Sequence, residues 1–378
     1  MDRTLCGALP SELESFLRDI DERSYRASQV LKWVHRRGVL DPRQMTDIPA
    51  ELRGRLDTEV PKLGARITDV ARSSDGTRKA RIALADGAAI ETVLIPDDEH
   101  GTDQEDEGGD AVGSVPASTP AGREPATGSK LTQCISTQVG CAFQCRFCLS
   151  GAGGLVRNLS ADEIVGQVHL ARETRESGER LTNVVLMGSG EPLANLDETF
   201  RAIELLTSPH GVGLSTRKVT VSTIGLPRGI ARLGEVFGGS IGLAVSLHGP
   251  DDETRARLLP RVGSVPLERV LEALAAYPLP RRRRITIEYV LVRGANDSPR
   301  HAAALVRALA SIRVKVNLIP FNEHPGSDLE TPDVGVVEEF QRVLLGRGIA
   351  TMLRKKRGAD IGAACGQLAA RGGGGPFA

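Results

Sequence analysis

The amino-acid sequence predicts an α/β protein in which a partial (β/α)6 barrel of the TIM type follows a small α+β accessory domain. After residue 131, short apolar segments alternate with amphipathic ones, a pattern typical of a parallel sheet covered by helices. Several predicted strands end in polar or glycine-rich residues, such as Gly188 to Glu191, where barrel enzymes place their chemistry. No Gly-x-Gly-x-x-Gly motif follows the first strand, which favours the barrel over an open doubly wound sheet.

Length and composition limit the class of protein. The chain has 378 residues, 40% of them hydrophobic and 25% charged, which suits a catalytic domain with an accessory part and excludes collagen, a coiled coil or a wholly disordered chain. No stretch approaches the roughly 18 to 20 consecutive apolar residues of a membrane span. The first residues lack the basic and then apolar pattern of a secretory signal, so we expect a cytoplasmic protein without membrane contact.

The accessory domain is expected to span residues 1–96. Within it, residues 11–57 indicate two or three short helices, because apolar side chains recur at helical spacing around Val30. The spacing then changes to that of strands over Arg66–Leu84 and Ala89–Ile95, with Asp-Gly turn signals inside and between these segments. We therefore expect a small antiparallel sheet after the helices.

Residues 97–130 are expected to form a disordered acidic insertion. Between Asp97 and Gly128 the chain has nine acidic side chains, one basic side chain and almost no large apolar residue, so burial cannot offset the loss of chain entropy. The rest of the chain has 47 basic and 39 acidic side chains, a net charge of +8, which suits a nucleic-acid partner. Basic residues cluster at Arg281–Arg284, at Arg354–Arg357 and between Arg23 and Arg37, although each cluster alone equally fits a solvated face.

The barrel core is expected over residues 131–358 and a C-terminal segment over 359–378, with a loose tail from Gly372. The predicted strands of the core are Asn183–Met187, Lys218–Ser222, Gly242–Ser246, Thr286–Leu291, Lys315–Ile319 and a last one near Ala350–Arg354. The predicted helices between them include Ala161–Arg175, Asp197–Leu206, Leu267–Ala276, Arg300–Ala310 and Val334–Leu345.

Four of the six cysteines lie within fifteen residues, which is too lopsided for a disulfide framework and favours metal or redox chemistry. Cys141, Cys145 and Cys148 are separated by three and two residues on a loop flanked by glycines. Three thiolates at this spacing can hold an iron-sulfur cube and leave one iron open to a further ligand. Alternatively, Cys134 joins them in a closed zinc site, and spacing alone leaves both possibilities open.

The spacing Cys-x-x-x-Cys-x-x-Cys resembles the signature of radical S-adenosylmethionine enzymes. The longer run from Cys134 to Leu159 resembles the RNA adenine methyltransferases of the RlmN and Cfr type, and the resemblance extends over most of the chain outside the insertion and the ends. Other segments that resemble blocks of this family, in the same order, are Tyr25–Val30, Glu91–Pro96, Asn183–Pro192, Val219–Thr223, Ser246–His248, Ile287–Tyr289, Asn317–Asn322 and Arg357–Gln367.

This resemblance implies two cofactors and the residues that hold them. Cys141, Cys145 and Cys148 would bind a [4Fe-4S] cluster, whose fourth iron would hold the amino and carboxylate groups of S-adenosylmethionine. Cofactors of this kind supply radical chemistry, and the protein directs it. The positions that match contacts to S-adenosylmethionine are Gly190, Glu191, Ser222, Ser246, Leu247, His248 and Asn322.

The resemblance also implies a catalytic set of three residues. Cys365 matches the cysteine that is methylated first, Cys134 the thiol that forms a disulfide with it to release the product, and Glu91 the proton acceptor. C2 of adenine is too electron-poor to displace a methyl group from a sulfonium, so a radical route is needed. The basic run Arg354–Arg357 before Cys365 would favour the thiolate that a nucleophile needs, whereas a lone cysteine is otherwise more often a buried apolar residue.

The expected function is therefore methylation of C2 of an adenosine in 23S ribosomal RNA and in transfer RNA, through an S-methylcysteine intermediate. The resemblance further implies an external electron donor of the flavodoxin or ferredoxin type, and we expect a monomer. Three alternatives stay open: methylation of C8, which is the Cfr activity; a related enzyme with another substrate; and a non-catalytic, zinc-stabilised RNA-binding protein. Cys6 has no assigned role.

Overall fold

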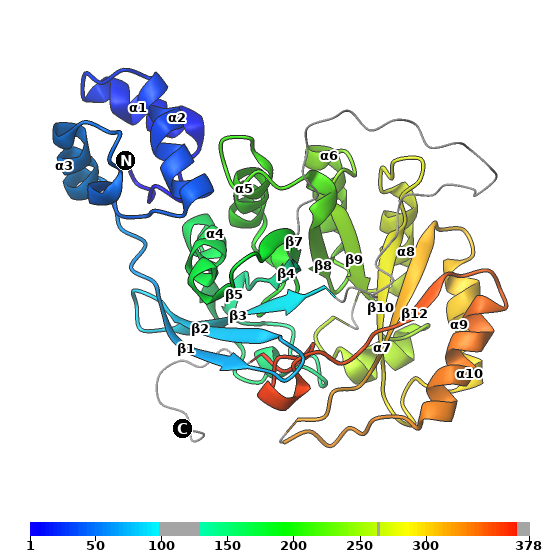
Figure 1. Cartoon of the computed structure of the whole chain (residues 1–378). Coiled ribbons are helices and arrows are strands. Elements are labelled where there is room, and N and C mark those ends of the chain that lie inside the picture. Colours follow the sequence, from blue (N-terminus) through cyan, green and yellow to red (C-terminus); the bar gives the residue numbers. More distant parts are fainter. Residues whose placement is uncertain (98–128, 263–264, 325, 369–378) are drawn as a thin grey trace, which may run out of the picture.

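The computed structural model of the chain describes residues 1–97, 129–262, 265–324 and 326–368. Within these residues, ten strands form one continuous mixed sheet and two further strands form a small hairpin (Figure 1). The described part contains no helix that is long and apolar enough to cross a membrane. Most of the insertion predicted for residues 97–130, and the tail predicted from Gly372, lie outside the described residues.

The main sheet changes from antiparallel to parallel at its fourth strand. Strands β1 to β4 pair antiparallel, whereas each neighbouring pair from β4 to β12 is parallel. The predicted partial barrel is confirmed, and in the described chain it has one parallel strand more than expected, because β4 joins it. In sheet order the strands are β1 (Arg66–Arg72), β2 (Arg78–Ala83), β3 (Ala89–Pro96), β4 (Lys130–Cys134), β7 (Arg180–Leu186), β8 (Val219–Thr223), β9 (Gly242–Ser246), β10 (Ile285–Leu291), β11 (Val314–Pro320) and β12 (Thr351–Leu353).

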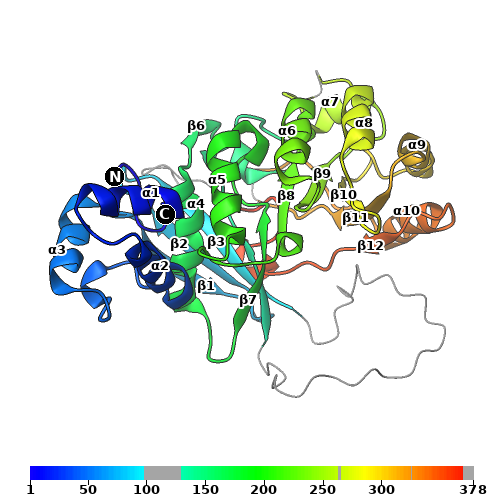
Figure 2. The same ribbon diagram turned by 90° about the horizontal axis from the view of Figure 1, so that it is seen from above.

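Helices cover one face of the parallel part of the sheet. Figure 2 shows α4 to α10 in an arc along one side of the strands. Apolar side chains at alternate strand positions, such as Val221, Val245 and Ile287, form the main core with these helices. The helices are α4 (Ala161–Leu170), α5 (Leu196–Thr207), α6 (Pro227–Phe237), α7 (Asp252–Leu258), α8 (Leu267–Ala276), α9 (Pro299–Leu309) and α10 (Val334–Leu345).

The N-terminal helices enclose a small core of their own. They dock beside α4 and α5, where Arg3 forms ion pairs with Asp162 at 3.2 Å and Glu198 at 2.5 Å. The buried His35 also contacts His169 of α4, with 3.2 Å between Nδ1 and Nε2. The short helices predicted for this region are α1 (Pro10–Asp19), α2 (Tyr25–Leu31) with a π-helical continuation (Lys32–Arg37), and α3 (Ala50–Glu59).

The C-terminal segment crosses the open side of the sheet from one edge to the other. It leaves β12 and reaches the β1–β2 hairpin, as the red trace in Figure 1 shows. There the backbone N–H of Gly358 donates to the Asp75 carboxylate at 2.9 Å, and the Ser73 hydroxyl donates to the Asp360 carboxylate at 2.5 Å. After a 3-10 turn (Ala359–Ile361), the residues around Cys365 are therefore held against the sheet.

Candidate active site

The inner face of the parallel sheet is polar, in contrast to its helix-covered face. Residues paired across neighbouring parallel strands share a face, and Glu288 of β10 lies between Ser246 of β9 and Asn317 of β11. Their chain neighbours Val245 and Ile287 point to the other side, into the main core. The strands therefore present a row of polar side chains on the face that the C-terminal segment crosses.

The three predicted cluster cysteines lie on the loop between β5 (Gln138–Gly140) and β6 (Leu155–Asn158). The backbone N–H of Cys141 donates to the carbonyl of Gly154 at 3.0 Å and closes this loop. A side chain at Gly140 would place its Cβ 2.0 Å from the same carbonyl, so the closure requires glycine there.

Cys141, Cys145 and Cys148 form a group of partly buried thiols within electrostatic range of one another. Burial, with a smaller contribution from the neighbouring Cys148, raises the pKa of Cys141 to about 11 and that of Cys145 well above its usual range. Burial also raises the pKa of Cys148. Such thiols hold their protons until a cation replaces them, so the donor set fits an iron-sulfur cluster, in which each thiolate binds a different iron.

Cys134, the fourth member of the alternative zinc site, lies apart from these three. It ends β4 and packs in a small cluster with Val93, Ala363 and Leu368. Burial, with a smaller contribution from the nearby Cys365, raises the pKa of Cys134 to about 12. No three His, Cys, Asp or Glu side chains in the described ranges converge as a single metal ion requires, so the geometry gives a closed zinc site no support.

Cys365 is held over the cysteine loop by backbone contacts. Its carbonyl accepts a hydrogen bond from Asn322 Nδ2 at 3.1 Å, and the carbonyl of Gly366 accepts one from the Leu149 N–H at 2.7 Å. Ser150 Oγ donates to the carbonyl of Leu368 at 2.6 Å. The exposed Cys365 side chain thus lies between the cluster loop and Cys134.

The predicted disulfide is not present. All six cysteines are free thiols, among them the buried Cys134 and the exposed Cys365. The prediction of a disulfide bond is therefore wrong for this structure. The C-terminal segment brings Cys365 near Cys134, and both are reduced.

Glu91 lies on β3, and its carboxylate is largely shielded from solvent. Lys79 of β2 links it to the C-terminal segment, because Lys79 Nζ lies 3.3 Å from Glu91 Oε1 and donates to the carbonyl of Gly362 at 3.1 Å. The structure thus brings Glu91 to the same side of the sheet edge as the segment that carries Cys365.

Gly190 and Glu191 follow β7 and line the inner end of the barrel. Gly190 has a φ of +105°, and a Cβ there would lie 2.6 Å from the side chain of Gln138. Glu191 is buried, and its two oxygens accept backbone hydrogen bonds from Leu193 at 3.0 Å and Ile224 at 2.9 Å. Burial raises the pKa of Glu191 to about 7. A buried carboxylate whose hydrogen bonds come from backbone amides and the Thr223 side chain, with no cation among these partners, suits a cationic ligand group such as an ammonium.

His248 follows β9 and contacts the cysteine loop. Its ring packs edge-on against Phe147, with 4.5 Å between centroids, and its backbone has a φ of +55°. Nδ1 accepts a hydrogen bond from the Val290 N–H at 3.0 Å, and burial lowers the pKa of His248 to about 3. His248 is therefore neutral, with its proton on Nε2, and suits hydrogen bonding better than metal binding.

The other predicted cofactor contacts line the same end of the barrel. Ser222 is the last residue but one of β8 and Ser246 is the last of β9, and both are half-buried. Leu247 is buried, and its N–H donates to the carbonyl of Glu288 at 3.1 Å. Asn322 Oδ1 is buried and has no hydrogen-bond partner in the described part of the chain, which leaves an acceptor for a ligand.

Sequence reasoning missed a polar group beside this site. Asn317 Nδ2 donates to Glu288 Oε1 at 3.0 Å, and an Arg354 nitrogen lies 3.8 Å from Glu288 Oε2. Arg354 also lowers the pKa of Cys134, which connects this group to the two thiols. A signal was present, because Glu288 is a charged residue within the apolar run Ile-Thr-Ile-Glu-Tyr-Val-Leu.

Known proteins resemble this chain over nearly its whole length. The Radical SAM superfamily model matches residues 135–306, and the model of the Ribosomal RNA large subunit methyltransferase N-terminal domain matches residues 4–60. A Dual-specificity RNA methyltransferase RlmN from Sorangium cellulosum is 51% identical over 95% of this chain and 94% of its own length. One from Syntrophobacter fumaroxidans is 43% identical over 95% and 96%.

A solved structure agrees with these relatives. The crystal structure of a radical SAM methyltransferase from Sphaerobacter thermophilus matches with a TM-score of 0.84 and 37% identity, over 97% of this chain and 99% of that one. Because 51% identity extends over nearly the full length of both chains and both family models match, the chain belongs to the family of RlmN-type dual-specificity RNA methyltransferases within the radical SAM superfamily.

Proposed function

We propose that this chain methylates C2 of an adenosine in RNA and that Cys365 carries the methyl group. The observation that supports this most strongly is the position of Cys365, between the cysteine loop and Cys134. A methyl carrier must reach the cofactor, the base and a second thiol in turn. The Asn322 hydrogen bond and the backbone contacts of Gly366 and Leu368 hold the segment that carries Cys365 against the cysteine loop, which supports this role.

In this proposal Cys141, Cys145 and Cys148 hold a [4Fe-4S] cluster. The buried carboxylate of Glu191 pairs with the amino group of S-adenosylmethionine, and Ser222, Ser246, Leu247, His248, Asn322 and the bare backbone of Gly190 line the rest of its site. When bound, the two groups supply the methyl group and a radical that removes hydrogen from carbon.

The chain's own residues then carry the reaction in sequence. The Cys365 thiolate takes a methyl group from S-adenosylmethionine. One hydrogen is then lost from this S-methyl group, and its carbon bonds to C2 of adenine, which joins protein and RNA. That hydrogen, and the one electron released when the ring becomes aromatic again, would pass to the bound cofactors. Glu91 takes the proton that C2 loses. The Cys134 thiolate attacks the Cys365 sulfur and forms a sulfur–sulfur bond. The sulfur–carbon bond breaks with its electron pair on the carbon, which takes a proton and becomes the methyl group of the freed base. The sulfur–sulfur bond formed in that step is a turnover intermediate, consistent with free thiols in the resting protein.

We further propose large-subunit ribosomal RNA and transfer RNA as substrates. The match of residues 4–60 to the Ribosomal RNA large subunit methyltransferase N-terminal domain and the dual specificity in the names of the relatives support this. Both RNAs and a flavodoxin-like or ferredoxin-like electron donor occur in the cytoplasm, where we place a monomeric enzyme.

Methylation mapping tests the proposal. Ribosomal and transfer RNA from a strain lacking the gene are digested and analysed by mass spectrometry, with and without the gene restored. We expect 2-methyladenosine to return with the wild-type gene and not with a Cys365→Ala variant. Return of 8-methyladenosine would show that the enzyme methylates C8, which is the Cfr-type activity. If neither RNA gains a methyl group, the proposal is excluded.

Anaerobic purification tests the cluster separately. The wild-type protein should be brown and contain about four irons per chain, and a Cys145→Ala variant should lose them. A colourless protein that holds only zinc would favour the RNA-binding alternative.

A further inference from the structure

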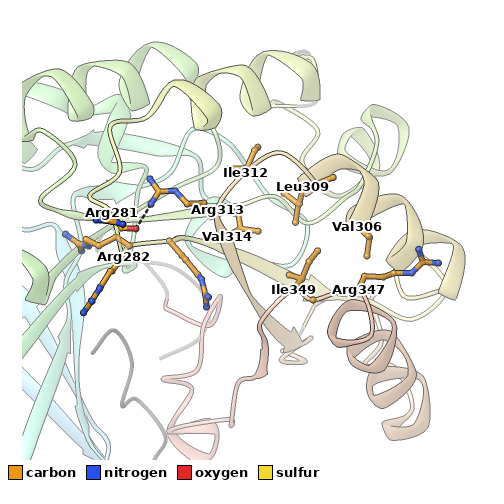
Figure 3. Close-up of a pocket in the computed structure, with 13 residues that line it drawn as sticks. Arg281, Arg282, Val306, Leu309, Ile312, Arg313, Val314, Arg347 and Ile349 are labelled. Carbon is orange, nitrogen blue, oxygen red and sulfur yellow. Dashed lines mark hydrogen bonds between the residues drawn. The ribbon is translucent and has the colours of Figure 1, made fainter. Parts of the chain in front are cut away.

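The cluster Arg281–Arg284 lines a hollow that the proposed reaction does not use. Together with Arg313 and Arg347 it surrounds a cavity of about 500 Å³ with an aliphatic floor, here called the arginine cavity. Figure 3 shows Arg313 beside the cluster and aliphatic side chains such as Ile349 opposite. None of the described residues that line this cavity is acidic, so its only formal charges are positive.

Two of the six arginines hold the cavity wall in place. Arg313 donates three hydrogen bonds to backbone carbonyls of residues 279–281, and Arg283 donates to the carbonyls of residues 239 and 240. The loop before β10 is thus fixed to its neighbours. The other four arginines of the cavity have exposed side chains, so the fold presents several guanidinium groups around one hollow.

The arginine cavity lies at the opposite end of the strands from the candidate active site. Arg284 directly precedes β10 and Arg313 directly precedes β11, so both stand at the amino ends of parallel strands. Ser246 and Asn322 stand at or beyond the carboxyl ends. A strand of seven residues such as β10 spans roughly 20 Å, so one small ligand cannot occupy both places.

We propose that the arginine cavity binds the sugar–phosphate backbone of the RNA substrate, away from the nucleotide that is methylated. This rests on the proposed function, which supplies the RNA. Guanidinium groups pair with phosphate oxygens through two parallel hydrogen bonds, and several of them around a hollow of this size suit successive phosphates. Among the described residues that line it, none has an aromatic ring on which a base would stack, so the contact depends on backbone charge and not on sequence.

A competing explanation lies within the fold. Helix α9 ends at Leu309 and α10 at Leu345, next to the cavity, and cations stabilise the carboxyl ends of helices. In that case the arginines would contribute to folding stability and make no difference to RNA binding. The two explanations therefore predict different results for the same substitutions.

The experiment compares the wild-type chain with a cavity variant in which Arg281, Arg282, Arg284 and Arg347 are all replaced by Gln. Arg283 and Arg313 are kept because they hold the loop. A control variant carries the same number of Arg→Gln changes on the exposed surfaces of α6, α7 and α8, at Arg228, Arg232, Arg257 and Arg269. The measurements are the affinity for an unmethylated large-subunit ribosomal RNA transcript over a range of KCl concentrations, the Tm, and methylation of Cys365 in cells.

We expect the slope of log Kd against log salt to fall by about 3 in the cavity variant, because each lost phosphate contact removes about 0.7 to 0.9. The slope of the control variant should change by less than about 1. Cys365 should be methylated to the same extent in all three proteins, because the cavity is remote from the thiols.

Equal slopes in the cavity variant and the wild type would overturn the inference, and a lower Tm with an unchanged slope would assign the arginines to the helix ends. A slope that falls equally in both variants would also overturn it, since net charge would then be the cause. Failure of the wild-type chain to bind or methylate RNA would instead contradict the proposed function.

Discussion

At the scale of the single residue, the buried carboxyl group of Glu191 links stability to pH. Burial raises its pKa from 4.5 to about 7, so between these values the folded chain keeps a proton that the unfolded chain has lost. The free energy of unfolding therefore falls as pH rises through this window. Replacing Glu191 by Gln should remove up to about 1.4 kcal/mol per pH unit from that slope in the cofactor-free protein.

Urea unfolding of wild type and Glu191→Gln at several pH values between 5 and 7 measures the effect. The quantity to compare is the change in unfolding free energy per pH unit. The absolute stability is not comparable, because Gln replaces one carboxylate oxygen that accepts a backbone hydrogen bond by an amide donor, which changes stability at every pH. An exposed carboxyl changed in the same way, Glu235→Gln, provides the control. Parallel curves for wild type and Glu191→Gln would show that this carboxyl group does not titrate in the window.

Cys134 gives the residue-scale prediction for chemistry. If its thiol releases the base from Cys365, then Cys134→Ala should methylate Cys365 and form the carbon–carbon bond but leave protein and RNA covalently joined. A denaturing gel of the anaerobically isolated variant should show a slow band that ribonuclease removes. The double variant with Cys365→Ala should show none. A Cys134→Ala protein that releases methylated RNA normally would remove Cys134 from the mechanism.

The positions of some site residues could be predicted from the sequence, and those of others could not. Short spacing alone brings Cys141, Cys145 and Cys148 onto one loop, because neighbours in the chain cannot be far apart. The approach of Cys365 to Cys134 depends on the C-terminal segment crossing the sheet, and no local pattern encodes it; only the family resemblance anticipated it. Arg354 was predicted as part of a basic run before Cys365, and its contacts with Glu288 and Met187 depend on tertiary structure that the basic run does not indicate.

At the scale of the element, strands with a helix-covered face were the most predictable. The segment Gly242–Ser246 was predicted with the bounds of β9, and Leu267–Ala276 and Val334–Leu345 with those of α8 and α10. Strand β4 was missed because its sequence, Lys-Leu-Thr-Gln-Cys, has no apolar run; it is defined by antiparallel pairing to β3 and parallel pairing to β7. Tertiary pairing decides such a strand, and composition does not.

The contact between the N-terminal helices and α4 gives the element-scale prediction. His35 and His169 are buried against each other, with Arg36, Arg172 and Arg175 nearby, and burial lowers the pKa of His35 to about 4 and that of His169 well below its usual range. The folded protein therefore holds fewer protons than the unfolded chain below about pH 6.5, so the stability of this contact is lost as pH falls from about 6.5 towards 4.

Replacing both histidines by Leu should reduce the loss of stability between pH 7 and pH 5. The double substitution should lower the free energy of unfolding at pH 7 only slightly, because both hydrogen-bonding partners are removed together. Urea unfolding at pH 7 and pH 5 gives the comparison, and His210→Leu, at an exposed position, serves as the control. A double variant that loses as much stability as wild type between pH 7 and pH 5 would exclude the pair as the source.

At the scale of the whole molecule, one sheet connects all the parts that the proposed reaction needs. Glu91 comes from the antiparallel part, Cys134 from the strand at which the direction changes, and Ser246 from the parallel part. The C-terminal segment spans the two edges and brings Cys365 to the middle. The sequence predicted the antiparallel and the parallel strands as separate sheets. They form one continuous sheet because β3 pairs with β4, and no sequence pattern predicts that pairing.

That pairing leads to a prediction about residues 98–128. The backbone N–H of Asp97 donates to the carbonyl of Lys130 at 2.9 Å, and Pro96 pairs with Leu131, so the two ends of this segment already meet as a hairpin does. Replacing residues 98–128 by a short Gly-Ser turn should leave the Tm within about 3 °C of wild type. Differential scanning calorimetry measures it, and a larger fall would mean that the segment contributes packing to the fold.

The same deletion should also change RNA binding, because residues 98–128 contain eight acidic side chains and one basic one, and their loss moves the net charge from 0 to +7. Affinity for RNA should rise at low salt and converge with wild type at high salt, since screening suppresses long-range attraction. A full-length variant with those eight residues changed to Asn or Gln separates charge from chain length. If charge is the cause, that variant and the deletion gain the same affinity; a gain in the deletion alone would show that the segment obstructs RNA by its bulk.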